Sequence, residues 1–309
     1  MRALDELGLD PGPMPLELDP MAGTGARLLS DIPATPAPPT LLGRLDPLGS
    51  TVLFGTGGVG KGVMASWWTC GLVEAGHRVL LVDYEAHPGE WARRIGTLGG
   101  SAVTEAVMYV SPNSPEWTRT RGPLWAQADD LRELATEHGA TYAIVDSAVP
   151  ACAGMDPSKA ETIGLYAGGL ARIGRPSLTL AHVTKASDGV YPFGSVFWHN
   201  LSRITWQLSR EGDDLRLINR KANNYPHLGR FAVSFTWHDG ILGEVSERPY
   251  SVVMGDRIAE LLAASGPLTL GEIVGELSAD GDAIKANTVT AALHRGAFVL
   301  NGQKWGPAE

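Results

Sequence analysis

Hydrophobic residues in the first two thirds of the chain form short continuous runs that alternate with longer amphipathic stretches. These runs predict strands at 51–54, 78–85, 106–110, 141–147 and 177–183. Runs this apolar are typical of strands that are buried on both faces of a parallel sheet. The stretches between them predict helices, each ending at a glycine, at 61–76, 88–99, 124–139 and 161–174. The alternation predicts an α/β fold with a parallel central sheet and helices on both of its faces.

The pattern changes after residue 194, where short runs of alternating apolar and polar residues are separated by turn residues. Antiparallel edge strands are predicted at 202–210, 213–221 and 229–237. Helical periodicity then returns at 254–265, 269–278 and 284–296, followed by a hairpin at 297–307. That order suits a small winged-helix domain. We therefore expect a Pro-rich N-terminal arm or linker, an α/β domain and a winged-helix domain, at 1–40, 41–248 and 249–309.

Composition narrows the class of protein. Of the 309 residues, 44% are hydrophobic and 19% are charged, an ordinary globular balance. No uncharged apolar run reaches the roughly 18 residues that cross a bilayer, and the acidic N-terminus lacks the apolar core of a signal sequence. We therefore expect a cytoplasmic protein without a membrane partner. The net charge of −9 argues against coating DNA by overall attraction, so any nucleic-acid contact must come from a local basic patch.

A glycine-rich segment links the first predicted strand to the first predicted helix. It places Gly55, Gly60 and Lys61 where the phosphate-binding loop G-x-x-x-x-G-K-[ST] requires them. In such a loop the backbone N–H groups and the helix dipole bind phosphate, and the lysine reaches the β- and γ-phosphates. Position 62, where a hydroxyl should hold magnesium, is glycine. The predicted ATP-binding residues are Gly55, Thr56, Gly57, Gly58, Val59, Gly60, Lys61, Gly62 and Val63.

Two carboxylates follow predicted strands and are candidates for the chemistry of hydrolysis. Asp146 ends an apolar strand, where a carboxylate can hold Mg²⁺ through water. Glu85 ends the second strand and can orient or deprotonate the attacking water. Asp83 lies two residues earlier on the same side and competes for that role. Slower hydrolysis or weaker magnesium affinity is left open by Gly62.

At this point the sequence resembles the RecA-like hexameric ATPases, and most closely the RepA-type plasmid replicative helicases and their phage relatives. The resemblance covers about residues 41–240. It rests on the loop GTGGVGKG, on Glu85, on Asp146-Ser147 and on the segments LAHVTKA, GSVFWHNLSRITWQL and RKANNYP. It implies a RecA-like P-loop fold, ATP with Mg²⁺, and a ring of six subunits that moves on single-stranded DNA. It also implies that Glu85 is the catalytic glutamate, Asp146 bridges the metal and His182 senses the γ-phosphate.

In such rings a neighbouring subunit completes each site with basic residues. The resemblance assigns this role to Lys221, with Arg220 and Arg230 as candidate arginine fingers. Asn223 stands where related helicases often have arginine. The candidate DNA-binding residues are Lys185 and Ser195 in or beside a central loop, Arg203 on the following strand, and Lys285 and Arg295 in the winged helix. The winged helix binds either DNA or a replication protein on this reading.

Three other readings stay open. ParA-type partition ATPases share part of the loop, but their signature lysine is Thr56 here, and both hydroxyl positions are missing. A nucleotide-dependent DNA-binding regulator that hydrolyses ATP poorly is favoured by Gly62 and disfavoured by Glu85 and Asp146. A RecA-like recombinase would share the same fold, and the sequence does not separate strand exchange from unwinding.

Overall fold

The computed structural model describes residues 28–32, 38–183, 192, 196–211, 214–238, 241–278 and 284–307. The chain divides into two compact units, Met1–Pro38 and Pro39–Glu309. In the first unit the described residues contain one short 3-10 turn, η1 (Leu29–Asp31), with no buried side chain. Leu28 and Leu29 are exposed there. The role of this segment as an arm or a linker stays a prediction.

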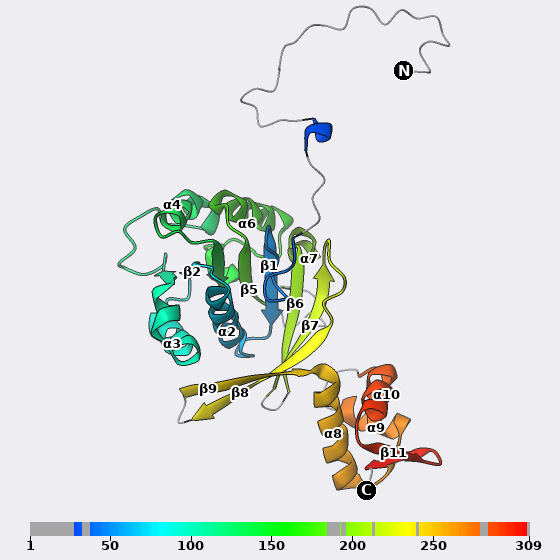
Figure 1. The fold of residues 1–309 in the computed structure, drawn as a ribbon. Coiled ribbons are helices and arrows are strands. Elements are labelled where there is room, and N and C mark those ends of the chain that lie inside the picture. Colours follow the sequence, from blue (N-terminus) through cyan, green and yellow to red (C-terminus); the bar gives the residue numbers. More distant parts are fainter. Residues whose placement is uncertain are drawn as a thin grey trace, which may run out of the picture. The chain divides into compact units, whose positions relative to one another are not determined.

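A nine-stranded sheet forms the centre of the second unit, in the order β3-β2-β4-β5-β1-β6-β7-β8-β9 (Figure 1). Neighbouring strands run parallel from β3 as far as β6, and antiparallel from β6 to β9. The strands are β1 (Ser50–Gly55), β2 (Val79–Asp83), β3 (Val107–Val110), β4 (Tyr142–Asp146), β5 (Ser177–His182), β6 (Ile204–Glu211), β7 (Asp214–Ala222), β8 (Arg230–His238) and β9 (Ile241–Pro249).

Helices cover both faces of the parallel strands, as the apolar runs predict. Alternate residues of β1 point to opposite faces, so Leu53 belongs to one core and Phe54 to the other. The helices α2 (Lys61–Glu74) and α3 (Pro88–Glu105) pack on the side of Leu53. The opposite face carries α4 (Leu124–Glu137), α5 (Ala148–Ala151), α6 (Ala160–Ile173) and α7 (Val196–Leu201). The predicted α/β class with a parallel central sheet is therefore confirmed.

The antiparallel part of the sheet differs in detail from the prediction. β6 does not sit in an antiparallel edge: it pairs in parallel with β1, where Thr51 lies opposite Ile204. Alternating polarity marks a strand with one covered face but does not give its direction, so the pattern could not reveal this. β9 was not predicted from the sequence, because its segment ILGEVSERP carries a glycine, a proline and three charged residues.

The C-terminal part of the chain contains α8 (Tyr250–Ser265), β10 (Leu268–Thr269), α9 (Leu270–Ser278), α10 (Ala286–Arg295), β11 (Phe298–Asn301) and β12 (Lys304–Pro307). Its three strands form a separate sheet in the order β10-β12-β11. It also has its own core, in which Ile258, Ile273, Val289 and Trp305 are buried. None of the helices that the structure describes is both long enough and apolar enough to span a bilayer.

Candidate nucleotide-binding site

The candidate site lies at the carboxyl ends of the parallel strands. Register brings Gly55 opposite His182 and Asp83 opposite Asp146, so residues distant in sequence meet at this edge. A pocket of about 370 Å³ opens there. It is lined by Gly58, Gly60, Lys61, Gly62, Val63, Glu85, His87, Glu90, Trp91, Arg94, Asp146, His182 and Arg210. The predicted phosphate loop, the two candidate carboxylates and the candidate sensor are thus brought to one cavity.

The phosphate loop packs against β6 and β7, the next two strands of the sheet after β1. A Cβ atom added at Gly55 would lie 2.4 Å from the Leu208 carbonyl oxygen of β6, so this position accepts only glycine. At Gly60 an added Cβ would lie 3.0 Å from the Leu215 side chain of β7. Strands β6 and β7 therefore both pack against the loop.

Lys61 begins α2, and its side chain folds back over the loop. Its Nζ donates to the carbonyl oxygens of Thr56 at 2.8 Å and Gly55 at 3.2 Å, and lies 3.2 Å from His182 Nδ1. Burial lowers the pKa of Lys61 to about 8, although the nearby Asp146 and Glu85 favour its charged form. An ammonium held by two neutral carbonyls and a ring nitrogen is ready to exchange these partners for phosphate oxygens.

Glu85 follows β2 and faces the pocket. Its Oε1 accepts a 2.6 Å hydrogen bond from the Ser147 hydroxyl and lies 3.9 Å from His182 Nε2. The His182 ring and then the Ser147 hydroxyl lower the pKa of Glu85 to about 2, against the opposing effect of partial burial. The carboxylate is therefore ionised at neutral pH, the state in which it can accept a proton from water.

Asp83, the competing candidate, does not line this pocket. Its side chain is fully buried, and its two oxygens accept hydrogen bonds from the backbone N–H groups of Glu85, Ala86 and His87 at 2.7–3.1 Å. The Tyr109 hydroxyl donates a fourth, at 2.8 Å. Asp83 thus shapes the loop that carries Glu85 and acts as a positioning residue.

Asp146 ends β4 and is the candidate magnesium ligand. Burial, and then the negative charges of Glu85 and Asp83, raise the pKa of Asp146 to about 7, while Lys61 and Arg94 oppose the rise. The residues fit magnesium only in part. Asp146 offers one carboxylate, Gly62 offers no hydroxyl, and no cluster of three or more metal-binding side chains occurs among the residues described.

Several residues of the pocket have no counterpart in the sequence motifs. The α3 residues Glu90, Trp91 and Arg94 line the pocket, although the sequence predicts them only as part of a helix. Ser147, which the resemblance includes without a role, does not line the pocket but donates a hydrogen bond to Glu85. Arg210 on β6 also lines the cavity. A helix pattern says which residues face inward but not which neighbour they meet, so only the placement of α3 beside α2 reveals these side chains.

The remaining candidates lie elsewhere. Lys221 and Arg203 are near the amino end of β1, and the Arg220 guanidinium donates to Gln207 Oε1. Lys285 and Arg295 are exposed in the C-terminal part, at the start and end of α10. Arg230 is exposed where β8 begins. Lys185 and Ser195 lie outside the described residues.

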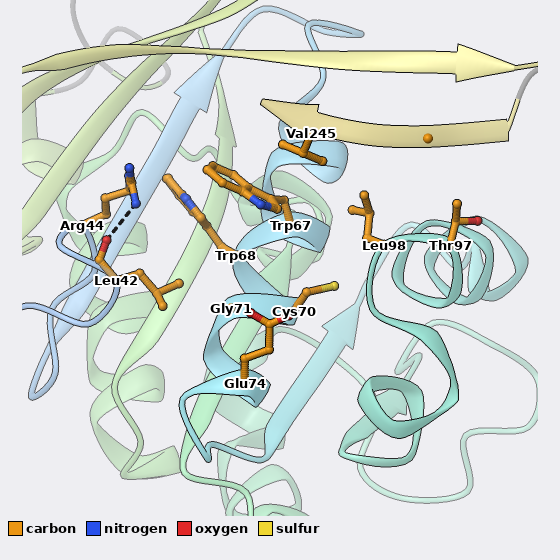
Figure 2. Close-up of a pocket in the computed structure, with 11 residues that line it drawn as sticks. Leu42, Arg44, Trp67, Trp68, Cys70, Gly71, Glu74, Thr97, Leu98 and Val245 are labelled. Atoms are coloured by element: carbon orange, nitrogen blue, oxygen red, sulfur yellow. Dashed lines mark hydrogen bonds between the residues drawn. The ribbon is translucent and has the colours of Figure 1, made fainter. Parts of the chain in front are cut away.

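A larger pocket of about 660 Å³ lies beside α2, α3 and β9 (Figure 2). Trp67 and Trp68 line it, and Arg44 donates a 2.8 Å hydrogen bond to the Leu42 carbonyl at its rim. The Arg44 guanidinium also lies 5.6 Å from the centre of the Trp67 ring. This cavity contains none of the predicted site residues, so the smaller pocket is the candidate nucleotide site.

The fold and the smaller pocket together define a RecA-like P-loop nucleotide-binding domain. Residues 21–188, more than half of the chain, match the family model described as AAA domain, and the chain belongs to this family. Membership makes it a nucleotide-dependent ATPase. No curated protein matches the chain.

Proposed function

We propose that this ATPase is a ring-forming motor that couples ATP hydrolysis to movement along single-stranded DNA, in the manner of a RepA-type replicative helicase. The observation that supports it best is the separation of the charged groups along β1. Glu85, Asp146 and His182 surround Lys61 at the carboxyl end of the strand. The basic residues Arg203 and Lys221 lie at its amino end.

The strand register gives this separation its scale. Thr51, the second residue of β1, lies opposite Ile204, while Thr205 of β6 lies opposite Lys221 of β7. The Arg203 backbone N–H donates to the Ser50 carbonyl at 2.8 Å. Arg203 and Lys221 therefore lie at the opposite end of β1 from the phosphate loop of their own subunit. This position is expected for groups that serve a neighbouring subunit.

Four side chains of the pocket have a defined role in the proposed hydrolysis. Lys61 and the backbone of the phosphate loop bind the triphosphate. Glu85 is ionised and accepts the proton of the attacking water, and Ser147 holds its Oε1 in place. His182 connects Lys61 to Glu85 and so can respond to the γ-phosphate. Asp146 would hold a magnesium ion through water, and that ion supplies positive charge to the phosphates.

A complementation experiment tests whether Lys221 acts in trans. Glu85→Gln and Lys221→Ala are each expected to lose ATP hydrolysis. When the two inactive variants are mixed, a subunit with intact Glu85 can lie beside a subunit with intact Lys221. We expect up to about a quarter of the wild-type activity in the mixture, because about one interface in four is then complete.

Lys159→Ala is the matched control, since it removes an exposed lysine of the same charge that does not line the pocket. Lys221 also donates to the carbonyl oxygens of His199 at 2.7 Å and Asn200 at 2.9 Å, so the thermal unfolding of each variant must be compared with the wild type. Two folded, individually inactive variants that never complement one another would contradict a trans-acting Lys221.

Contact with DNA is a further part of the proposal. Lys185 and Ser195 are assigned to it by the resemblance, together with Arg203. In the C-terminal part, the helices and the small three-stranded sheet are proposed to form a winged helix whose Lys285 and Arg295 bind DNA or a replication protein. Hydrolysis stimulated by single-stranded DNA, with weaker DNA binding after Lys285→Ala and Arg295→Ala together, is the expected result. A hexameric assembly and a cytoplasmic location belong to the same proposal.

A second candidate is a nucleotide-dependent DNA-binding regulator that hydrolyses ATP slowly. Gly62 favours it, because the loop lacks the hydroxyl that orders the metal. ATP hydrolysis measured with Mg²⁺, in the presence and absence of single-stranded DNA, separates the two. Tight ATP binding with no turnover in either condition would replace the motor by the regulator.

A further inference from the structure

The guanidinium of an arginine from another helix lies beside Gly62. A Cβ atom added at position 62 would lie 2.7 Å from Arg94 Nη1, closer than non-bonded atoms approach. Arg94 comes from α3, and Gly62 is the second residue of α2. A serine or threonine at 62 would therefore require the Arg94 guanidinium, the end of a flexible side chain, to move from its observed position. The loop thus lacks a hydroxyl at position 62 and has the Arg94 guanidinium beside it instead.

Arg94 is held in place and still has capacity to bind. Its Nη2 pairs with Glu90 Oε2 at 2.8 Å, one turn earlier on α3, and only 24% of its side chain is exposed. Its Nε is buried and has no hydrogen-bond partner within the described part of the chain. A buried N–H group without a partner is costly, and a ligand that accepts its hydrogen bond relieves this cost.

Arg94 lies in the candidate nucleotide pocket. It lines the same cavity as Lys61 and Asp146, and it is one of the two cations that oppose the rise in the pKa of Asp146. A guanidinium is permanently charged and presents a planar set of N–H donors that matches two phosphate oxygens at once. In a P-loop with a hydroxyl, positive charge at this place comes from magnesium.

We propose that Arg94 binds the β- and γ-phosphates of the nucleotide from the place vacated at Gly62, so that this chain binds a nucleoside triphosphate without Mg²⁺. The inference rests on the proposed function, since it requires that this pocket binds the nucleotide. It goes further by assigning a phosphate-binding residue outside the P-loop and a changed metal dependence of binding.

The test is the dissociation constant of a fluorescent N-methylanthraniloyl-ATP for the full chain, measured with Mg²⁺ and with EDTA. We expect the wild type to bind in EDTA within about 3-fold of its affinity in Mg²⁺. Arg94→Gln is expected to weaken binding in EDTA by at least about 10-fold, the effect of losing one charge-assisted contact. Arg93→Gln is the matched control, because Arg93 pairs with the same Glu90 but does not line the pocket.

A double variant makes the test reciprocal. Arg94→Gln combined with Gly62→Ser restores the hydroxyl and the space for it, so tight binding should return in Mg²⁺ and stay weak in EDTA. Gly62→Ser alone should weaken binding in both conditions because Arg94 is displaced. Thermal unfolding of each variant identifies any that has failed to fold, and the Arg94→Gln and wild-type pair decides the matter without the others.

The outcomes separate this inference from the proposed function. If the wild type binds the nucleotide in Mg²⁺ but loses it in EDTA, or if Arg94→Gln binds as the wild type does in EDTA, the role of Arg94 is overturned and the ATPase stands. If the wild type binds no nucleotide in either condition, both the proposed function and this inference are overturned.

Discussion

Ser147 joins the ends of two neighbouring strands by donating a 2.6 Å hydrogen bond to Glu85 Oε1. Ser147 is fully buried, whereas the Glu85 side chain is 38% exposed to the pocket. Because the buried Ser147 hydroxyl holds the more exposed Glu85 carboxylate, that carboxylate has a defined orientation before any nucleotide binds. The hydrogen bond also favours the ionised form of Glu85.

Ser147→Ala should therefore lower the rate of ATP hydrolysis by about 10-fold while leaving the affinity for nucleotide nearly unchanged, since one hydrogen bond to a charged group is lost. Steady-state kcat and equilibrium nucleotide binding measure the two effects. Ser202→Ala is the control: it removes another buried serine hydroxyl, which donates to the Trp198 carbonyl and does not line the pocket. Equal losses in the two variants would show that the effect is not specific to Glu85.

Asp83→Asn should reduce hydrolysis by at least about 10-fold, because an amide cannot accept all the hydrogen bonds that shape the Glu85 loop. The same change should destabilise the fold by about 1–3 kcal/mol, the cost of leaving buried donors unpaired. Urea unfolding and kcat check the two effects. Tyr109→Phe removes only the phenolic donor to the same carboxylate and should have a much smaller effect on hydrolysis. Unchanged hydrolysis in Asp83→Asn would argue against its positioning role.

Nucleotide affinity should fall as the pH rises above about 8. The pKa of Lys61 is lowered to about 8, so the free protein carries the ammonium below that pH and loses it above. Phosphate binds the charged form, and affinity should drop by about 10-fold for each further pH unit. Titration calorimetry between pH 7 and 9 should also detect proton uptake on binding above pH 8. Lys61→Arg keeps its charge, and a slope that persists in this variant would assign the titration to another group.

Asp146→Asn should stabilise the nucleotide-free protein, and more so at high pH. Asp146 has its pKa raised to about 7 in the fold, so its ionised form is less favourable there than in the unfolded chain. The cost grows as the pH rises from about 4 to 7 and is fully present above 7. We expect a gain in unfolding free energy on the order of a few kcal/mol at pH 8, and a smaller gain at pH 5. A larger gain at pH 5 than at pH 8 would reverse the sign and contradict the assignment.

The parallel half of the fold could be predicted from the sequence because burial on both faces leaves continuous apolar runs, and the carboxyl ends of such strands meet at one edge. The same rule brought Glu85, Asp146 and His182 to the phosphate loop. The distinction between Asp83 and Glu85 could not be predicted. Both are carboxylates at the end of one strand, and only the turn after Asp83 directs its oxygens to backbone N–H groups.

The proximity of Gly62 and Arg94 could not be predicted from the sequence either. The two residues are separated by a strand and the first turns of another helix, and no local pattern tells which α3 side chain meets the start of α2. From the sequence alone Gly62 was a departure from the expected loop. Tertiary packing places the Arg94 guanidinium close to the point where a side chain at 62 would begin.

The support of the phosphate loop by β6 and β7 has a mechanical consequence. Two residues of interest lie near opposite ends of β7. Leu215 lies beside Gly60 of the phosphate loop. Lys221 is the residue proposed to serve the neighbouring subunit. The two residues are about 20 Å apart along the strand, at the usual rise per residue. β7 pairs with β6 along its length and with β8 from Asp214 to Ile218, so the strand is stiff and can transmit a displacement. In the proposed ring, a shift of one subunit's loop on losing phosphate would move the cation at the next subunit's site, so that neighbouring sites would hydrolyse ATP in succession.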